Sequence, residues 1–217
     1  MKSVVFNFSV IVTLSILGNL KGKCEMKLYQ LILAVAVLLA ASPTRNVSAA
    51  DYVLDDQHTS VVFTTSHFGF SYTYGMFGKY TGQFSVDMQN PTQANFQFTI
   101  DAASLDTKSE KRDQHLRGPD FFNVKQFPEI TFVSRSVEAS ADGKTLNITG
   151  DLTLHGQTKS IVLPLTYLGA GKGPYGNDRI GFMGRTKVKR SDFGMGAMAP
   201  QIGDDVTLLI SFEGLQQ

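Results

Sequence analysis

The chain has 217 residues with 20 basic and 19 acidic side chains, and its one cysteine, Cys24, excludes an internal disulfide or a cluster of thiolate ligands. Five of the basic and one of the acidic residues lie in residues 1–49, which leaves 15 and 18 in residues 50–217. The resulting net charge near −3 argues against a nucleic-acid or anionic-membrane partner.

The N-terminal part has the features of an export signal. From Met26 the chain reads Met-Lys, an apolar run over 28–41 and small residues up to Ala49 and Ala50. This order predicts a secretory signal peptide over 26–49, cleaved near Ala49/Ala50, and therefore a periplasmic protein. The run is shorter than the roughly 20 apolar residues that span a bilayer, so no membrane span is expected after cleavage.

A second apolar run lies upstream, within residues 1–25. We interpret this stretch as an extension from a misassigned start, with Met26 as the true start; an anchor or an unusually long leader is the alternative. Lipidation of Cys24 is not expected, because Lys23 stands where a lipoprotein signal requires a small residue.

Residues 50–217 are expected to form one all-β domain, because a two-residue alternation of apolar and polar side chains dominates from residue 51. The strands are predicted at 51–55, 58–68, 76–88, 93–104, 129–140, 143–155, 158–169, 179–190 and 204–215. Eight or nine sequential strands with short turns favour an extended antiparallel up-and-down β-barrel. A barrel of this size is either filled by side chains or wide enough for one small ligand.

One segment breaks the strand pattern. Thr107 and Glu110 have the spacing of a capping box, and Gly118-Pro119 is a stop signal. Together they predict a short helix over 108–117, which would cap the barrel.

Aromatic residues suggest where an apolar bore would lie. Phe68, Phe70, Tyr72 and Tyr74 alternate, so in a strand all four would project from one face. Such a stripe would line a pocket or form ordinary barrel core, and the sequence does not decide between them. Further candidates for the inward face are Phe63, Phe84, Phe96, Phe98, Phe132 and Phe182.

The densest polar cluster contains Arg112, His115 and Arg117. Its arginines would either clamp a phosphate or carboxylate head group at the barrel mouth or fix a helix that seals the barrel. No Gly-x-Ser-x-Gly elbow, phosphate-binding glycine loop or zinc-type histidine spacing is present. We therefore expect no catalytic residue, no metal site and no cofactor.

A series of motifs extends over residues 50–217: Ser60-Val-Val-Phe63, Arg112-Asp-Gln-His-Leu-Arg117, Phe127-Pro-Glu-Ile-Thr-Phe132, Gly150-Asp-Leu-Thr-Leu-His-Gly156 and Arg190-Ser-Asp-Phe-Gly194. In these motifs the chain resembles the YceI-like family of periplasmic, lipocalin-like, polyisoprenoid-binding proteins. The resemblance implies a barrel whose bore holds an isoprenoid. With Phe68 from the aromatic stripe, the expected ligand-binding set is Phe63, Phe68, Phe77, Phe84, Phe96, Phe98, Phe121, Phe122, Phe132, Phe182 and Phe193.

The function that follows is a periplasmic carrier for a polyisoprenoid or similar long-chain amphiphile, such as a quinone or prenyl phosphate. Three alternatives remain open. The first is an enzyme that modifies such a lipid with His67, Asp113 or His115 as acid–base groups, the second a structural or stress protein with a filled core, and the third a small outer-membrane barrel. The oligomeric state, monomer or dimer, is also left open.

Overall fold

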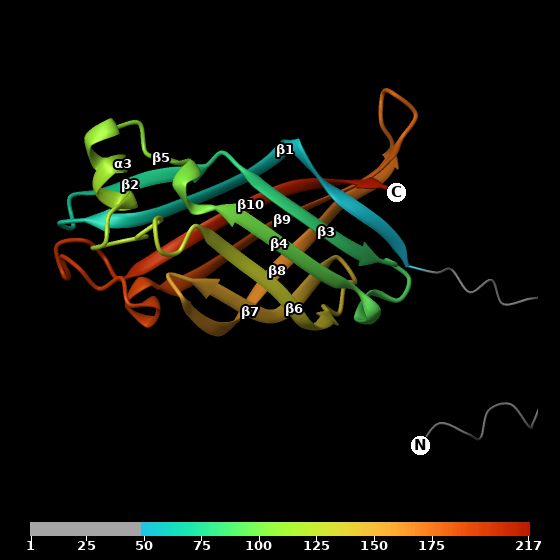
Figure 1. Cartoon of the computed structure of the whole chain (residues 1–217). Coiled ribbons are helices and arrows are strands. Elements are labelled where there is room, and N and C mark those ends of the chain that lie inside the picture. Colours follow the sequence, from blue (N-terminus) through green and yellow to red (C-terminus); the bar gives the residue numbers. More distant parts are fainter. Residues whose placement is uncertain (1–48) are drawn as a thin grey trace, which may run out of the picture. The chain divides into compact units, whose positions relative to one another are not determined.

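The computed structural model describes residues 49–217, which form a β-barrel with one α-helix at one end (Figure 1). The expected signal peptide and upstream extension fall on residues 1–48, outside the described residues. Within the described range, no helix has the length and apolar character needed to cross a bilayer.

The strands form one antiparallel sheet that closes on itself because the last strand pairs with the first. Their bounds are β1 Ala50–His67, β2 Ser71–Phe77, β3 Tyr80–Val86, β4 Asn95–Asp101, β5 Leu105–Asp106, β6 Glu129–Ala139, β7 Thr145–Leu154, β8 Gln157–Lys172, β9 Asp178–Lys189 and β10 Asp205–Gln216. β2 and β3 both pair with β1, so together they act as one interrupted strand. On their other side β5 pairs with β2 and β4 pairs with β3, so β4 and β5 likewise act as one interrupted strand. The barrel therefore has eight strands, and the predicted all-β antiparallel barrel is confirmed.

The predicted strand 93–104 is shorter in the structure, since β4 ends at Asp101 and a 3-10 helix follows over Ala102–Ser104. Two further differences concern how the strands are divided. The predicted strands 51–55 and 58–68 are the single strand β1, whose pairing with β10 shifts register between Asp55 and Ser60 through a β-bulge. The polar run inside the bulge reads as a break in the sequence, although the ladder continues on both sides. The predicted strand 76–88 is divided at 78–79, and its first part begins earlier, at Ser71.

The helix, α3, spans Glu110–Arg117 and begins two residues later than predicted. The predicted capping box is wrong, since Ser109 occupies the N-cap position and makes no side-chain cap hydrogen bond. The Thr107 hydroxyl instead donates to the carboxylate of Asp113 (2.5 Å), which also accepts the Thr107 backbone N–H (2.9 Å). Asp113 is buried, so this side chain ties the helix back to the chain that enters it.

Aromatic rings fill one half of the barrel. Phe84 and Phe96 stack at a centroid distance of 5.4 Å, and Phe182 and Phe212 pack against them edge-on or tilted at 5.5–6.1 Å. Tyr52 covers the other side of Phe84 at 5.1 Å. We call Tyr52, Phe84, Phe96, Phe182 and Phe212 the aromatic plug. It lies toward the end where β1 begins and β10 finishes, opposite α3 (Figure 1).

Candidate functional site

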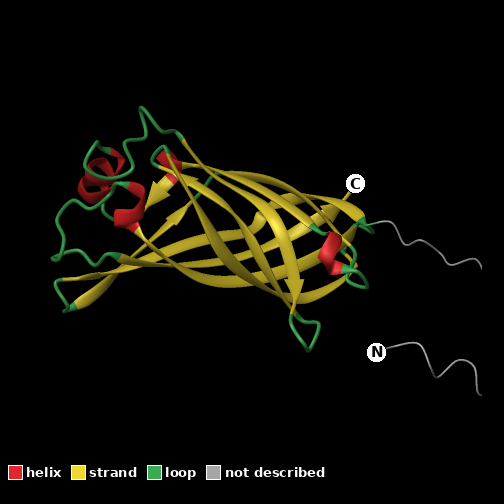
Figure 2. Cartoon of the chain, turned by 90° about the horizontal axis from the view of Figure 1, so that it is seen from below, coloured by secondary structure: helices red, strands yellow, loops and turns green. Residues whose placement is uncertain are grey.

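The half of the barrel nearer α3 is hollow. It encloses a cavity of about 930 Å³, near the upper end of the range of small-molecule sites. The walls come from the inward faces of the strands, and the mouth lies among α3, the β1–β2 turn and the loop after η3 (Arg190–Phe193), which share one end of the barrel (Figure 2). The barrel is therefore filled at one end and hollow at the other, a combination that the sequence left undecided.

The phenylalanines expected to bind ligand separate into four groups. Six of the eleven line the cavity: Phe63, Phe77, Phe98, Phe121, Phe122 and Phe132. Phe84, Phe96 and Phe182 lie in the aromatic plug, and Phe193 is buried beside the mouth without lining the cavity. Phe68 is half exposed in the β1–β2 turn. The cavity wall also contains many aliphatic side chains, such as Val61, Leu163 and Leu208.

Glycines explain how so many rings fit without filling the bore. Phe63 pairs across the strands with Gly75, and a Cβ built on Gly75 would lie 2.2 Å from the Phe63 ring. Phe98 likewise pairs with Gly82, where a Cβ would lie 2.4 Å from the ring. Gly150 is a diagonal neighbour of Phe132 on the adjacent strand, and a Cβ there would lie 2.6 Å from that ring. Each ring therefore lies flat over a glycine against the wall, and the centre of the bore stays open.

We expect Gly75→Ala to push the Phe63 ring away from the wall and into the cavity. Overpacking of this kind costs about 1–3 kcal/mol in the free energy of unfolding. The substitution should also weaken binding of a long-chain ligand, measured by calorimetric titration. Gly171→Ala is the control, because nothing lies within 4 Å of a Cβ at that position. Equal ligand affinity in both variants would contradict the proposed role of Gly75.

The predicted aromatic stripe does not line the bore as one face. Phe68 and Gly69 have φ angles of +51° and +73° and turn the chain, so β2 begins only at Ser71. Since Phe63 points inward opposite Gly75, Tyr74 and Tyr72 point outward, and they are 60% and 66% exposed. Phe70 at the tip of the turn is 91% exposed. Tyr72 and Tyr74 are nevertheless among the residues that line the cavity, whereas Phe68 and Phe70 are not. The pocket-wall interpretation therefore holds for two of the four residues, and the barrel-core interpretation is wrong for these exposed side chains.

The three polar candidates near α3 have different surroundings. Arg117 donates from Nε to the carbonyl of Ala103 (2.8 Å) and from Nη2 to that of Leu105, and it does not line the cavity. It braces the helix, as in the helix-cap interpretation. Arg112 and His115 do line the cavity. The His115 ring packs edge-on against Phe121 and lies 3.2 Å from a carboxylate oxygen of Asp120.

A buried arginine at the mouth, Arg190, was missed by sequence reasoning. The residue is 4% exposed, and its guanidinium donates to the backbone carbonyls of Met195, Ala197, Ile202 and Gly203. Desolvation by burial lowers the pKa of Arg190, although the charge of Asp204 opposes this effect. Arg190 thus holds the loop that forms one side of the mouth. The motif Arg190-Ser-Asp-Phe-Gly194 was the available signal, but the acceptors belong to the loop that follows it.

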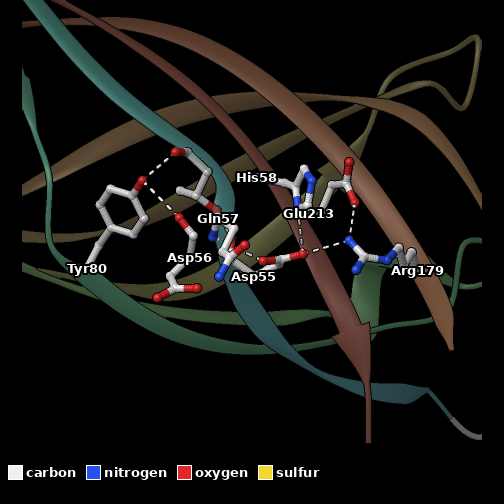
Figure 3. A network of polar contacts seen from close by, with 8 residues as sticks. Asp55, Asp56, Gln57, His58, Tyr80, Arg179 and Glu213 are labelled. Carbon is white, nitrogen blue, oxygen red and sulfur yellow. Dashed lines mark hydrogen bonds and ion pairs between the residues drawn. The ribbon is translucent and has the colours of Figure 1, made fainter. Parts of the chain in front are cut away.

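On the outside of the barrel, a polar network holds the bulge of β1 in place (Figure 3). The buried carboxylate of Asp55 accepts from His58 Nδ1 (2.8 Å), the Gln57 backbone N–H (3.0 Å) and Arg179 Nη1 (2.6 Å). Arg179 Nη1 also reaches Glu213 at 2.7 Å. Asp55, His58 and Glu213 have the composition of a metal site, but the guanidinium of Arg179 already supplies the positive charge between the two carboxylates.

This network makes a prediction about pH. Burial alone would raise the pKa of Asp55, but the hydrogen bonds from His58, Arg179 and Gln57 outweigh it and hold the pKa below the ordinary 3.8. The stability that this carboxylate contributes is therefore complete above pH 3.8 and is lost as the pH falls through the lower pKa of the folded state. Asp55→Asn should remove this part of the acid dependence, measured by urea unfolding between pH 6 and pH 3. Identical pH profiles for both proteins would contradict the assignment.

The residues proposed for acid–base chemistry are not assembled with one another. Asp113 accepts a hydrogen bond from Thr107, and His115 contacts Asp120. The His67 ring packs edge-on against Phe68 at a centroid distance of 4.8 Å. Within residues 49–217 no hydrogen bond joins any two of the three. The cavity thus combines an apolar bore with a polar rim, an arrangement suited to an amphiphile.

Comparison with known proteins agrees with this architecture. The model of the YceI-like domain matches residues 52–214. A UPF0312 protein of Ectopseudomonas mendocina is 41% identical over 187 residues, which cover 85% of this chain and 97% of that protein. The crystal structure of Burkholderia cenocepacia BcnA superimposes with a TM-score of 0.67 at 28% identity and covers 74% of this chain and 98% of that one.

A more distant likeness concerns the fold alone. A domain from Saccharophagus degradans, described as polyisoprenoid-binding and implicated in plant cell wall breakdown, has a TM-score of 0.60 at 16% identity and covers 78% of this chain and 99% of that domain. The family model extends over nearly the whole described barrel, and the curated relative matches over almost its full length. The chain therefore belongs to the YceI-like family.

Proposed function

We propose that this protein binds a polyisoprenoid or similar long-chain lipid in its bore and carries it through the periplasm. The observation that carries the proposal is a bore closed by the aromatic plug at one end and open at the other, with an apolar wall between. A long apolar chain fits such a blind tube with its head group at the mouth. Burial stabilises the chain by about 0.8 kcal/mol per methylene, so the bore can supply most of the affinity.

Two further observations support the proposal. The Saccharophagus degradans domain of the same fold is described as polyisoprenoid-binding. The leader over 26–49 has the order of a secretory signal, which would bring the barrel to an aqueous compartment between two membranes. A lipid in such a compartment needs its chain shielded from water. Binding without chemistry is the simpler function, because the histidines at the cavity do not form a catalytic arrangement.

The direct test is native mass spectrometry of the protein purified from the periplasm without detergent, followed by organic extraction. A bound mass that extracts as a prenyl lipid would support the carrier function and identify the cargo. Protein that carries no lipid and takes up no added isoprenoid would contradict it. Recovery of chemically altered lipid after incubation would instead favour the enzyme alternative.

A further inference from the structure

The charges that face the bore are all positive. Four lysine and arginine side chains line the cavity: Lys108, Lys111, Arg112 and Arg190. Within the part of the chain that the structure describes, no aspartate or glutamate lines it. Residues 50–217 carry a net negative charge overall, so this local excess runs against the composition of the domain.

Two of the four cations already have an ion-pair or hydrogen-bond partner within the protein. Lys108 pairs with Asp106 at 2.6 Å. Arg190 donates its N–H groups to backbone carbonyls of the mouth loop. These contacts fix the positions of both cations, and Arg190 keeps a buried positive charge at the cavity wall.

The other two cations, Arg112 and Lys111, lack a carboxylate partner among residues 49–217. Arg112 donates from Nε to the Thr107 hydroxyl (2.7 Å) and from Nη2 to the Thr107 carbonyl (2.6 Å), which orients the guanidinium. Its Nη1 makes no hydrogen bond to the described residues. Lys111, next to it on the first turn of α3, is exposed and makes no hydrogen bond or ion pair within the described range. An oriented guanidinium with free N–H groups and a neighbouring ammonium match the acceptors of an oxyanion.

We infer that the rim around Arg112 and Lys111 binds an oxyanion head group, a phosphate or a carboxylate, on the lipid whose chain occupies the bore. The inference rests on the proposed function, because the chain brings the head group to the rim. A neutral ring such as a quinone would leave these cations uncompensated beside an apolar cavity. An anion would neutralise them and accept hydrogen bonds from the unused N–H groups of Arg112.

The first experiment compares ligands that share a chain and differ in the head group. Farnesol, farnesoic acid and farnesyl phosphate are titrated into the purified protein by calorimetry at low and high salt. We expect both anions to bind at least about tenfold more tightly than the alcohol at low salt, with a smaller difference at high salt. The tighter of the two anions identifies phosphate or carboxylate as the preferred head. Equal binding of all three would overturn the head-group inference and leave the carrier function intact, whereas no binding of any would overturn the carrier function itself.

Substitutions at the rim then test which residues bind the head group. Arg112→Gln should lower the affinity for the anionic ligands about tenfold and leave the affinity for farnesol unchanged. Because Arg112 also holds Thr107, Lys111→Gln serves as a second variant with no structural contacts, and it should cause a smaller loss confined to the anions. Lys125→Gln is the matched control, an exposed lysine that does not line the cavity. Unchanged affinity for the anions in both rim variants would overturn the assignment.

Discussion

Replacing Phe182 with alanine is expected to lower the free energy of unfolding by about 3–5 kcal/mol, the usual cost of removing a buried phenylalanine. Phe182 is fully buried and contacts four other rings, those of Tyr167, Phe84, Phe96 and Phe212, at centroid distances of 5.5–6.1 Å. Its removal leaves a void in the middle of the aromatic plug. Urea unfolding monitored by circular dichroism measures the change.

The same variant also tests how the plug limits the bore. If the plug sets the depth of the cavity, Phe182→Ala should improve the binding of longer prenyl chains relative to shorter ones, despite its lower stability. Phe70→Ala is the control, because Phe70 is 91% exposed and surface substitutions usually change stability by less than about 0.5 kcal/mol. A loss below about 1 kcal/mol for Phe182→Ala would mean that neighbouring rings close the void and that the plug is not tightly packed.

The strands of the barrel were predictable because each depends on a local pattern. Alternation in segments such as Phe96–Ile100 and Val206–Phe212 marks a half-buried strand whatever its partner is. The turns at Gly143 and Gly156 were equally local, since both glycines have positive φ. The capping box failed for a different reason. The Thr107 hydroxyl bonds Asp113, six residues along the chain, instead of capping the helix, and this bond depends on the burial of Asp113, which the spacing does not show.

The division of the bore into a filled and a hollow half could not be predicted from alternation. Phe96 and Phe98 both occur on β4, yet the first packs in the plug and the second lines the cavity. What separates them is their level along the barrel axis, which depends on the register of neighbouring strands. The glycines under the rings of Phe63, Phe98 and Phe132 also lie on neighbouring strands, and no spacing along the chain links them to those rings.

The buried guanidinium of Arg190 holds the loop on one side of the mouth, so Arg190→Met is expected to destabilise the protein by about 3–5 kcal/mol. Methionine retains much of the apolar stem but none of the donors, and four carbonyls of the loop lose their partner. An unsatisfied buried polar group costs about 1–3 kcal/mol, and partial entry of water would recover some of that loss. The cost therefore exceeds that of an ordinary surface substitution several-fold.

This prediction distinguishes a general loss of packing from opening of the mouth. Limited proteolysis should cut Arg190→Met within residues 194–203 at urea concentrations where the wild-type protein resists cleavage. Arg190→Lys should recover only part of the stability, because an ammonium has three donors and lacks the planar fork that reaches Gly203 and Ile202 together with Met195 and Ala197. Arg185→Met is the control, since Arg185 is exposed and makes no hydrogen bond within residues 49–217. Wild-type stability in Arg190→Met would show that the loop is held by its own backbone and by Phe193, and that the buried guanidinium serves the ligand instead.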